Sequence, residues 1–266
     1  QTYYKLNMQA GKDYLLGLAA DHRAALYLFS SASACTATAI EADCASGGLS
    51  GAFGEITGST GGATGFIFTP AAAGDYYIVA DTPTTSDVGG YTLTVSEVTQ
   101  NTGLVFQEID VGAPDYVVLR NNGTTPVSTA GYQVMMLDDN DPFTSPSVQA
   151  NLPTVTIPPG GAVYFIETGS TPQAGEQSLG DSIPFITSTD FIALLCTGAC
   201  KADGSNVVDV LLAGDRTGVF IPTGISVIGD VTKITSDVTE SYQRNSYTAG
   251  PPFIAIDWKV GATTRP

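Results

Sequence analysis

The chain has 266 residues, 14% of them charged, and its formal net charge is −16 from 10 basic and 26 acidic side chains. Lysine and arginine are too few to form the basic surface that nucleic acids require, and the longest apolar runs are too short to cross a bilayer. We therefore expect neither a nucleic-acid partner nor membrane insertion.

Residues 1–98 contain strand-length segments rich in β-branched and aromatic residues, with partial period-two alternation. Glycine-rich segments separate them, and no stretch carries a capped helical pattern. The pattern predicts an all-β domain, a sandwich or a barrel. The predicted strands are TYYKLNMQ, DYLLGLAA, AALYLFSS, TGFIFTPA, DYYIVADT and GYTLTVSE.

This domain resembles the bacterial pre-peptidase C-terminal domain over residues 2–98. The resemblance rests on four pieces in chain order: YKLNMQAGKDYLLGLAA, AALYLFSSASAC, GFIFTPAAAGDYYIVADT and GGYTLTVSEV. One departure is that Arg23, Ala24 and Ala25 stand where the family often has an aspartate before its Leu-Tyr-Leu strand. The resemblance implies a small, jelly-roll-like β-sandwich that accompanies secreted enzymes without being catalytic.

The short polar segment 99–103 is predicted to link this domain to a second one, which covers residues 104–266. Alternating apolar and polar residues again predict strands joined by turns, because one face of each strand enters a core while the other meets solvent. The predicted strands are LVFQEIDV, DYVVLRNN, YQVMMLDD, TVTIPP, AVYFIET, DFIALLC, NVVDVLLA, ESYQRNSY and AIDWKV.

The second domain resembles lamin-tail-type domains over residues 104–261, which implies an immunoglobulin-like β-sandwich. Arg244 and Trp258 occupy places that match the family, whereas Asp115-Tyr116 stand where the family commonly has Glu-Phe followed by a second glutamate. That departure weakens any acidic site carried over from the family. The motifs are FQEIDVGAPDYVVLRNNGTTPVSTAGYQVM, TIPPGGAVYFIET, DFIALLC, NVVDVLLAGD, SYQRN and IDWKV.

The four cysteines form two close pairs, Cys35 with Cys44 and Cys196 with Cys200. We predict two disulfides, each closing a small loop that stabilises the fold by about 2–3 kcal/mol. A zinc site at the second pair is the competing interpretation, but zinc usually needs further cysteine or histidine ligands nearby.

Disulfides favour an oxidising compartment. The chain begins at Gln1, which fits removal of a secretion signal or a fragment cut from a longer precursor. We therefore expect a secreted or cell-surface protein.

We predict no catalytic residues. The only histidine, His22, lies between two predicted strands beside Asp21 and Arg23, which favours a loop residue over a catalytic base. Glu108 and Asp110 lie two apart on one strand face and are the best candidates for a hydrolytic carboxylate pair. Acids are common at solvent-facing strand positions, so we expect a structural or surface role for these two and not catalysis.

The segment Asp138, Asp139, Asn140 and Asp141 gathers oxygen ligands that suit Ca²⁺, although the spacing of an EF-hand is absent. The alternative is an acidic turn in which Asp and Asn cap the backbone. We predict no required cofactor, with Ca²⁺ as the candidate ion.

Several tyrosines could line a sugar platform, but packing in or beside the core is the favoured interpretation, as it is for Trp258. These tyrosines are Tyr3, Tyr4, Tyr76, Tyr77, Tyr242 and Tyr247.

The favoured function is a non-enzymatic structural or adhesion protein that assembles with itself, as an oligomer or filament, through strand edges. The first strand is the predicted donor, with Thr2, Tyr3, Tyr4, Lys5 and Leu6 as its assembly residues. One alternative is an accessory region of a secreted hydrolase. Another is a calcium-dependent carbohydrate-binding module, whose partner would be an extracellular polysaccharide; an extracellular protein is a further candidate partner.

Overall fold

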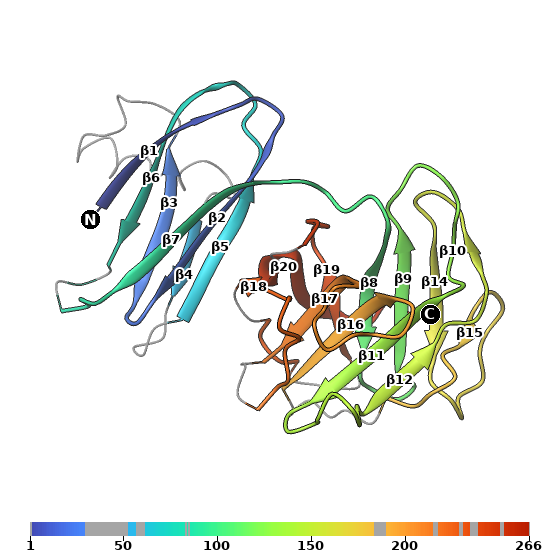
Figure 1. Ribbon diagram of the computed structural model, residues 1–266. Coiled ribbons are helices and arrows are strands. Elements are labelled where there is room, and N and C mark those ends of the chain that lie inside the picture. The colour runs from blue at the N-terminus through green and yellow to red at the C-terminus, as the bar shows by residue number, and fades with distance from the viewer. Residues whose placement is uncertain are drawn as a thin grey trace. The chain divides into compact units, whose positions relative to one another are not determined.

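Figure 1 shows the computed structural model of the chain. The structure describes residues 2–29, 53–56, 62–82, 84, 86–183, 190–214, 218–228, 231–234, 239–250 and 253–265. Strands make up nearly all of the secondary structure in these residues, so the predicted all-β fold is confirmed. The chain divides into two compact units, Gln1–Thr99 and Gln100–Pro266. Within the described ranges, no helix is long and apolar enough to span a membrane.

The first unit contains a four-stranded and a three-stranded sheet, and all strand pairs in both are antiparallel. In sheet order the four strands are β1 (Thr2–Met8), β6 (Gly74–Asp81), β3 (Ala24–Phe29) and β4 (Phe53–Ile56), and the three strands are β5 (Gly62–Phe68), β2 (Asp13–Ala20) and β7 (Tyr91–Val98). Within the described part of the first unit, β1 and β7 are end strands that each pair with one neighbour.

Alternation explains which side chains of β1 turn inward. Tyr4 stands beside Ile78 of β6, which in turn stands beside Leu28 of β3. Ile78 and Leu28 are buried, and Met8 is buried at the end of β1. The intervening residues of β1 point to the opposite face, because successive strand side chains alternate.

The second unit is built on a six-stranded and a four-stranded sheet (Figure 1). Two short strand pairs and a 3-10 helix, η2 (Ala255–Asp257), complete it. The six-stranded sheet runs β15 (Gln177–Ser178), β14 (Ala162–Ile166), β9 (Tyr116–Asn121), β8 (Leu104–Asp110), β19 (Glu240–Arg244) and β21 (Trp258–Ala262); the four-stranded sheet runs β12 (Val148–Asn151), β11 (Tyr132–Asp138), β16 (Phe191–Thr197) and β17 (Val207–Ala213); the short pairs are β10 (Val127–Ser128) with β13 (Thr156–Ile157) and β18 (Val227–Ile228) with β20 (Phe253–Ile254).

Strand β16 is buried on both faces, which explains why its sequence is apolar at nearly every position. Phe191 and Leu195 belong to the large core that joins side chains of the two main sheets. Ile192 and Leu194 belong to a second cluster on the opposite face, where Phe253 and residues of 219–227 cover them. The four-stranded sheet therefore lies between two apolar layers.

A β-bulge in β8 sets which side chains of that strand enter the core. Phe106 pairs with Leu119 and Glu108 with the adjacent Val118, so Gln107 is an extra residue. Leu104 and Phe106 point into the core before the bulge, and Ile109 and Val111 do so after it. The bulge therefore keeps Glu108 and Asp110 on the outer face of the six-stranded sheet, whereas regular pairing of Gln107 would turn them inward.

The segment predicted as a linker is bonded to the second unit over most of its length. Gln100 forms an isolated bridge with Thr248. The backbone N–H of Asn101 donates to the carbonyl of Tyr247, and its side-chain amide donates to the carbonyl of Val208. The boundary between the compact units accordingly falls between Thr99 and Gln100.

Candidate functional site

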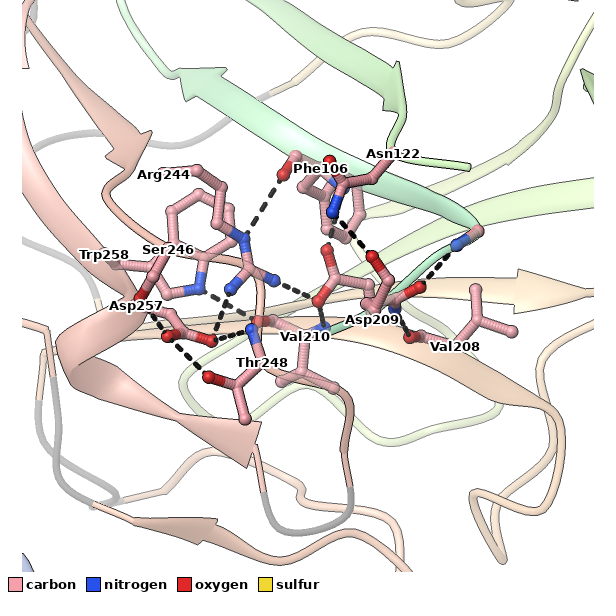
Figure 2. A network of polar contacts seen from close by, with 12 residues as sticks. Phe106, Asn122, Val208, Asp209, Val210, Arg244, Ser246, Thr248, Asp257 and Trp258 are labelled. Carbon is pink, nitrogen blue, oxygen red and sulfur yellow. Dashed lines mark hydrogen bonds and ion pairs between the residues drawn. The ribbon is translucent and has the colours of Figure 1, made fainter. Parts of the chain in front are cut away.

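Arg244 lies inside the second unit, on β19, and its side chain is 2% exposed. Its guanidinium carbon lies 4.2 Å from the ring centroid of Trp258, the neighbouring residue on β21. The guanidinium donates to Asp209 Oδ1, to Asp257 Oδ2 at 3.2 Å and to the carbonyl of Phe106 at 3.2 Å. Figure 2 shows these groups converging on the arginine from four elements.

The two carboxylates around Arg244 also accept hydrogen bonds from elsewhere. Asp209 accepts the backbone N–H of Phe106 at 2.8 Å and that of Val210 at 3.0 Å. Asp257 accepts the backbone N–H of Thr248 at 2.8 Å and its hydroxyl at 3.0 Å. Burial raises the pKa of Asp209, while Arg244 acts in the opposite direction. Because β17, β19, β8 and η2 all contribute, the network ties the two main sheets together.

Glu108 and Asp110 are 1% and 4% exposed, so of the two roles expected for them, structural or surface, the surface role is wrong. The carboxylate of Glu108 accepts the hydroxyl of Tyr116 at 2.7 Å, that of Ser241 at 2.6 Å and the backbone N–H of Thr264 at 3.0 Å. The reason for the burial is the C-terminal segment, which lies over this part of the sheet. A carboxylate held in this way is not exposed to a substrate.

The C-terminal segment is fixed by a second contact. Arg265 donates two hydrogen bonds of 2.9 Å to the carboxylate of Glu176. This partner lowers the pKa of Glu176 below its ordinary value. The hydroxyl of Thr264 donates to Glu108, and burial raises the pKa of Tyr116 well above that of a free tyrosine. The C-terminal segment therefore contacts both the ionised carboxylate of Glu176 and the neutral phenol of Tyr116.

A pocket of about 210 Å³ lies in the first unit. The start of β1, the ends of β2 and β6, the β2–β3 turn, the start of β3, the β6–β7 connection and β7 form its walls. Asp81, Asp87 and Tyr91 line it, together with the only histidine of the chain, His22. His22 lies in the turn between β2 and β3, at the strand junction where the sequence predicted a loop residue, and its side chain is 9% exposed.

Asp21 fixes the orientation of the His22 ring. Its Oδ1 lies 2.8 Å from His22 Nδ1, and its Oδ2 accepts the backbone N–H of Gly90 at 3.2 Å. These two contacts lower the pKa of the Asp21 carboxyl. The ionised carboxylate accepts a hydrogen bond from the Nδ1–H of the ring. A Cβ at position 89 would lie 2.0 Å from Asp21 Oδ1, so Gly89 is needed for the close approach.

Strands β1 and β7 meet beside this pocket, where the hydroxyls of Tyr4 and Tyr91 are 2.7 Å apart. Among the described residues, the exposed large apolar side chains are Tyr3, Tyr4, Val88 and Tyr91, all in the first unit. Of the predicted assembly residues, those from Thr2 to Lys5 are exposed and Leu6 is half-buried. The sequence-predicted strand thus lies at a sheet edge and carries exposed aromatic side chains.

The predicted calcium ligands form a tight turn after β11. Asp141 Oδ2 accepts the backbone N–H groups of Asp138 at 3.0 Å and Ser147 at 2.8 Å. Asp138 Oδ1 accepts the N–H of Asp139 at 2.8 Å, and Asn140 has a left-handed φ of 69°. Burial raises the pKa of Asp138. The described ranges hold no group of three or more His, Cys, Asp or Glu side chains placed around a metal. Calcium binding stays a prediction.

Cys196 and Cys200 form a disulfide at the end of β16, which occupies both sulfurs that the zinc interpretation would need. The backbone N–H of Cys200 also donates to Gln133 at 2.9 Å. The other predicted pair, Cys35 and Cys44, lies outside the described residues.

The six tyrosines considered for a sugar platform lie in different environments. Tyr76 and Tyr242 are buried, and Tyr77 packs beside a small cluster on the first unit. Tyr247 lies under the guanidinium of Arg120, whose carbon is 5.9 Å from its ring centroid. Only Tyr3 and Tyr4 of the six belong to the exposed set, so one continuous platform is not formed. Trp258 is a buried member of the second-unit core, as expected.

No protein-family model matches the chain, and no curated protein matches it. Two solved structures found by similarity are crystal structures of a GH2 beta-galacturonidase from Eisenbergiella tayi, bound to glycerol and to galacturonate. Their sequence identities are 11% and 9%, their TM-scores are 0.26 and 0.24, and the matches cover 80% and 79% of this chain. The chain spans 34% of the length of each enzyme. At these scores the likeness supports no inference about function.

Proposed function

We propose that this chain is a non-enzymatic structural protein of the cell surface or extracellular matrix that assembles by exchanging β1 between copies. The supporting observation is the state of β1, an edge strand in which five of seven side chains are exposed. Main-chain pairing with β6 over residues 2–8 holds it in place, and Met8 is its only fully buried side chain. Such a strand detaches at a small cost in apolar burial.

Strand exchange would recreate the same contacts between copies. The β6 edge of one copy would accept β1 of another in the same seven-residue register, including the 2.6 Å ion pair between Lys5 and Asp75. Because donor and acceptor edges differ, each copy can give one strand and receive another. A head-to-tail contact of this kind forms either rings or open filaments.

A disulfide across β1 and β6 tests the exchange. Asn7 and Asp75 face each other in register, and their side chains are joined by a 3.0 Å hydrogen bond. In the double variant N7C/D75C, the oxidised protein should stay monomeric in sedimentation velocity and show no filaments by electron microscopy. The unchanged protein and the reduced variant should both form larger species as concentration rises.

The reduced form of the variant is the matched control, since it carries the same substitutions without the bond. Mass spectrometry of peptides would verify that residues 7 and 75 are the linked pair. A strict monomer of the unchanged protein at high concentration, with and without Ca²⁺, would overturn the proposal. Assembly of the oxidised variant would also overturn it, because β1 cannot then leave its own sheet.

A further inference from the structure

The end strands β1 and β7 belong to different sheets of the first unit, and one tyrosine from each strand meets the other at the surface. We propose that Tyr4 and Tyr91 form a site of oxidative cross-linking, at which a one-electron oxidant joins the two phenols as dityrosine. The chemistry of this site does not depend on strand exchange. Its consequence for assembly rests on the proposed function, since Tyr4 lies on the strand that is exchanged.

The fold brings together two phenols that are 87 positions apart in the chain. Tyr4 stands beside Ile78 of β6, which is buried. Tyr91 begins β7 and shares a face of that strand with Leu93, which stands beside the buried Leu18 of β2. Each tyrosine therefore extends an apolar row of its own sheet to the edge of the unit, where the two hydroxyl oxygens lie 2.7 Å apart.

Both phenols are open to an oxidant in solution. Tyr4 and Tyr91 are each 38% exposed, whereas the phenols of Tyr116 and Tyr242 are buried. Tyr3 is also exposed, but it points to the opposite face of β1 from Tyr4, because successive strand side chains alternate. The site is therefore distinguished by exposure together with direct contact between two phenols.

The coupling removes one electron and one proton from each phenol and produces two tyrosyl radicals, whose spin is shared with the ring carbons ortho to the oxygen. One ortho carbon of each ring forms the new C–C bond, and the hydrogen that each carbon carried restores the hydroxyl of its own ring. A haem peroxidase with hydrogen peroxide takes up both electrons and both protons, and the peroxide becomes two molecules of water. The contact between the phenols favours coupling, because the second ring is already beside the first when the radicals form.

The new bond would fix β1 to whichever copy of the chain supplies β7. In a monomer it joins two strands of the same chain. In a strand-exchanged assembly the donor copy brings Tyr4 beside Tyr91 of the acceptor copy, because the pairing with β6 is recreated in the same register. Oxidation then converts a reversible assembly into a covalent one.

Oxidation of the full chain at low concentration, with a haem peroxidase and hydrogen peroxide, tests the site itself. The fluorescence of dityrosine should appear in the monomer. Mass spectrometry after proteolysis should find the peptides that contain residues 4 and 91 joined, with the loss of two hydrogen atoms. The variants Y4F and Y91F keep both rings and should each lose this linked peptide.

The variant Y3F is the matched control, since it removes an exposed phenol from the same strand and should keep the full yield of the linked peptide. Oxidation at concentrations where the unchanged protein assembles should give oligomers that persist on a denaturing gel, and Y91F should give none. In the disulfide-bonded form of N7C/D75C, β1 stays in its own sheet, so only the link within one chain should form.

An oxidised monomer without a link between residues 4 and 91 would refute the cross-linking site. Equal dityrosine fluorescence in the unchanged protein and in Y91F would also refute it, because other tyrosines would then carry the coupling. An assembly that is oxidised without links between chains would contradict the covalent joining of copies. A link within each chain of a protein that never assembles would support the site and count only against strand exchange.

Discussion

At the scale of single residues, Arg244 supplies the positive charge that pairs with the buried carboxylates of Asp209 and Asp257 in the second unit. Its replacement in R244M would retain an apolar side chain against Trp258 but leave Asp209 and Asp257 without their cation. Breaking a buried ion pair on one side costs about 3–5 kcal/mol. We expect that loss in denaturant unfolding followed by the fluorescence of Trp258, the only tryptophan in the chain.

Arg120 provides the matched control for this substitution. It is half-buried on β9 of the same sheet, and its Nε has no hydrogen-bond partner in the described structure. The variant R120M also removes a positive charge but leaves no buried carboxylate unpaired, so its cost should stay below about 1 kcal/mol. Similar losses in the two variants would contradict the role assigned to Arg244.

The residue-level partners could not be predicted from local sequence, because they come from distant positions. Glu108 is buried by Thr264, 156 positions further along the chain. Asp21, which orients His22, is held by Gly90, 69 positions away. Alternation predicted the strand on which Glu108 lies but not the segment that covers it. The sequence features that mark the pocket are the glycine pair Gly89-Gly90 and the turn residues Asp21 and His22.

At the scale of elements, the bulge in β8 fits one extra residue into the strand while the same side chains stay in the core. Deleting Gln107 would remove the extra residue and leave an unbroken alternation, with Leu104 and Phe106, then Ile109 and Val111, still pointing inward. The deletion should therefore lower the unfolding free energy by less than about 3 kcal/mol. We expect the deletion variant to keep the native Trp258 fluorescence and the cooperative unfolding transition of the second unit.

The substitution Q107A keeps the length of β8 and removes only a side chain whose Oε1 has no partner in the described structure. Its unfolding free energy should remain within about 1 kcal/mol of the unchanged protein. If the deletion variant failed to fold while Q107A folded, Gln107 would not be the extra residue of this strand.

Strand-length apolar segments predicted the all-β fold, since period-two alternation and glycine-rich turns are local signals. The same signals could not reveal the bulge, which changes the phase of the alternation within one strand. They also could not show that the four-stranded sheet is covered twice. The apolar run of β16 marks a strand buried on both faces, but the cover comes from residues 219–227 and Phe253, which carry no periodic pattern.

At the scale of the whole molecule, each compact unit contains its own spectroscopic reporter. His22 is the only histidine and lies in the first unit, while Trp258 is the only tryptophan and lies in the second. The second unit also contains Tyr116 and Tyr242, two buried phenols whose pKa values are raised. The first unit has a raised tyrosine, Tyr4, but its side chain is exposed and can lose its proton without unfolding.

High pH should therefore unfold the second unit before the first. Burial raises the pKa of Tyr242 to about 12, whereas an unfolded tyrosine has a pKa of about 10. The folded state binds the phenolic proton more tightly, so stability is fully present below pH 10 and is lost as the pH rises toward 12. Trp258 fluorescence should report the loss while the His22 resonances stay native. Simultaneous loss of both signals would contradict separate cores, and tyrosinate absorbance from all 12 tyrosines without unfolding would contradict the burial of these phenols.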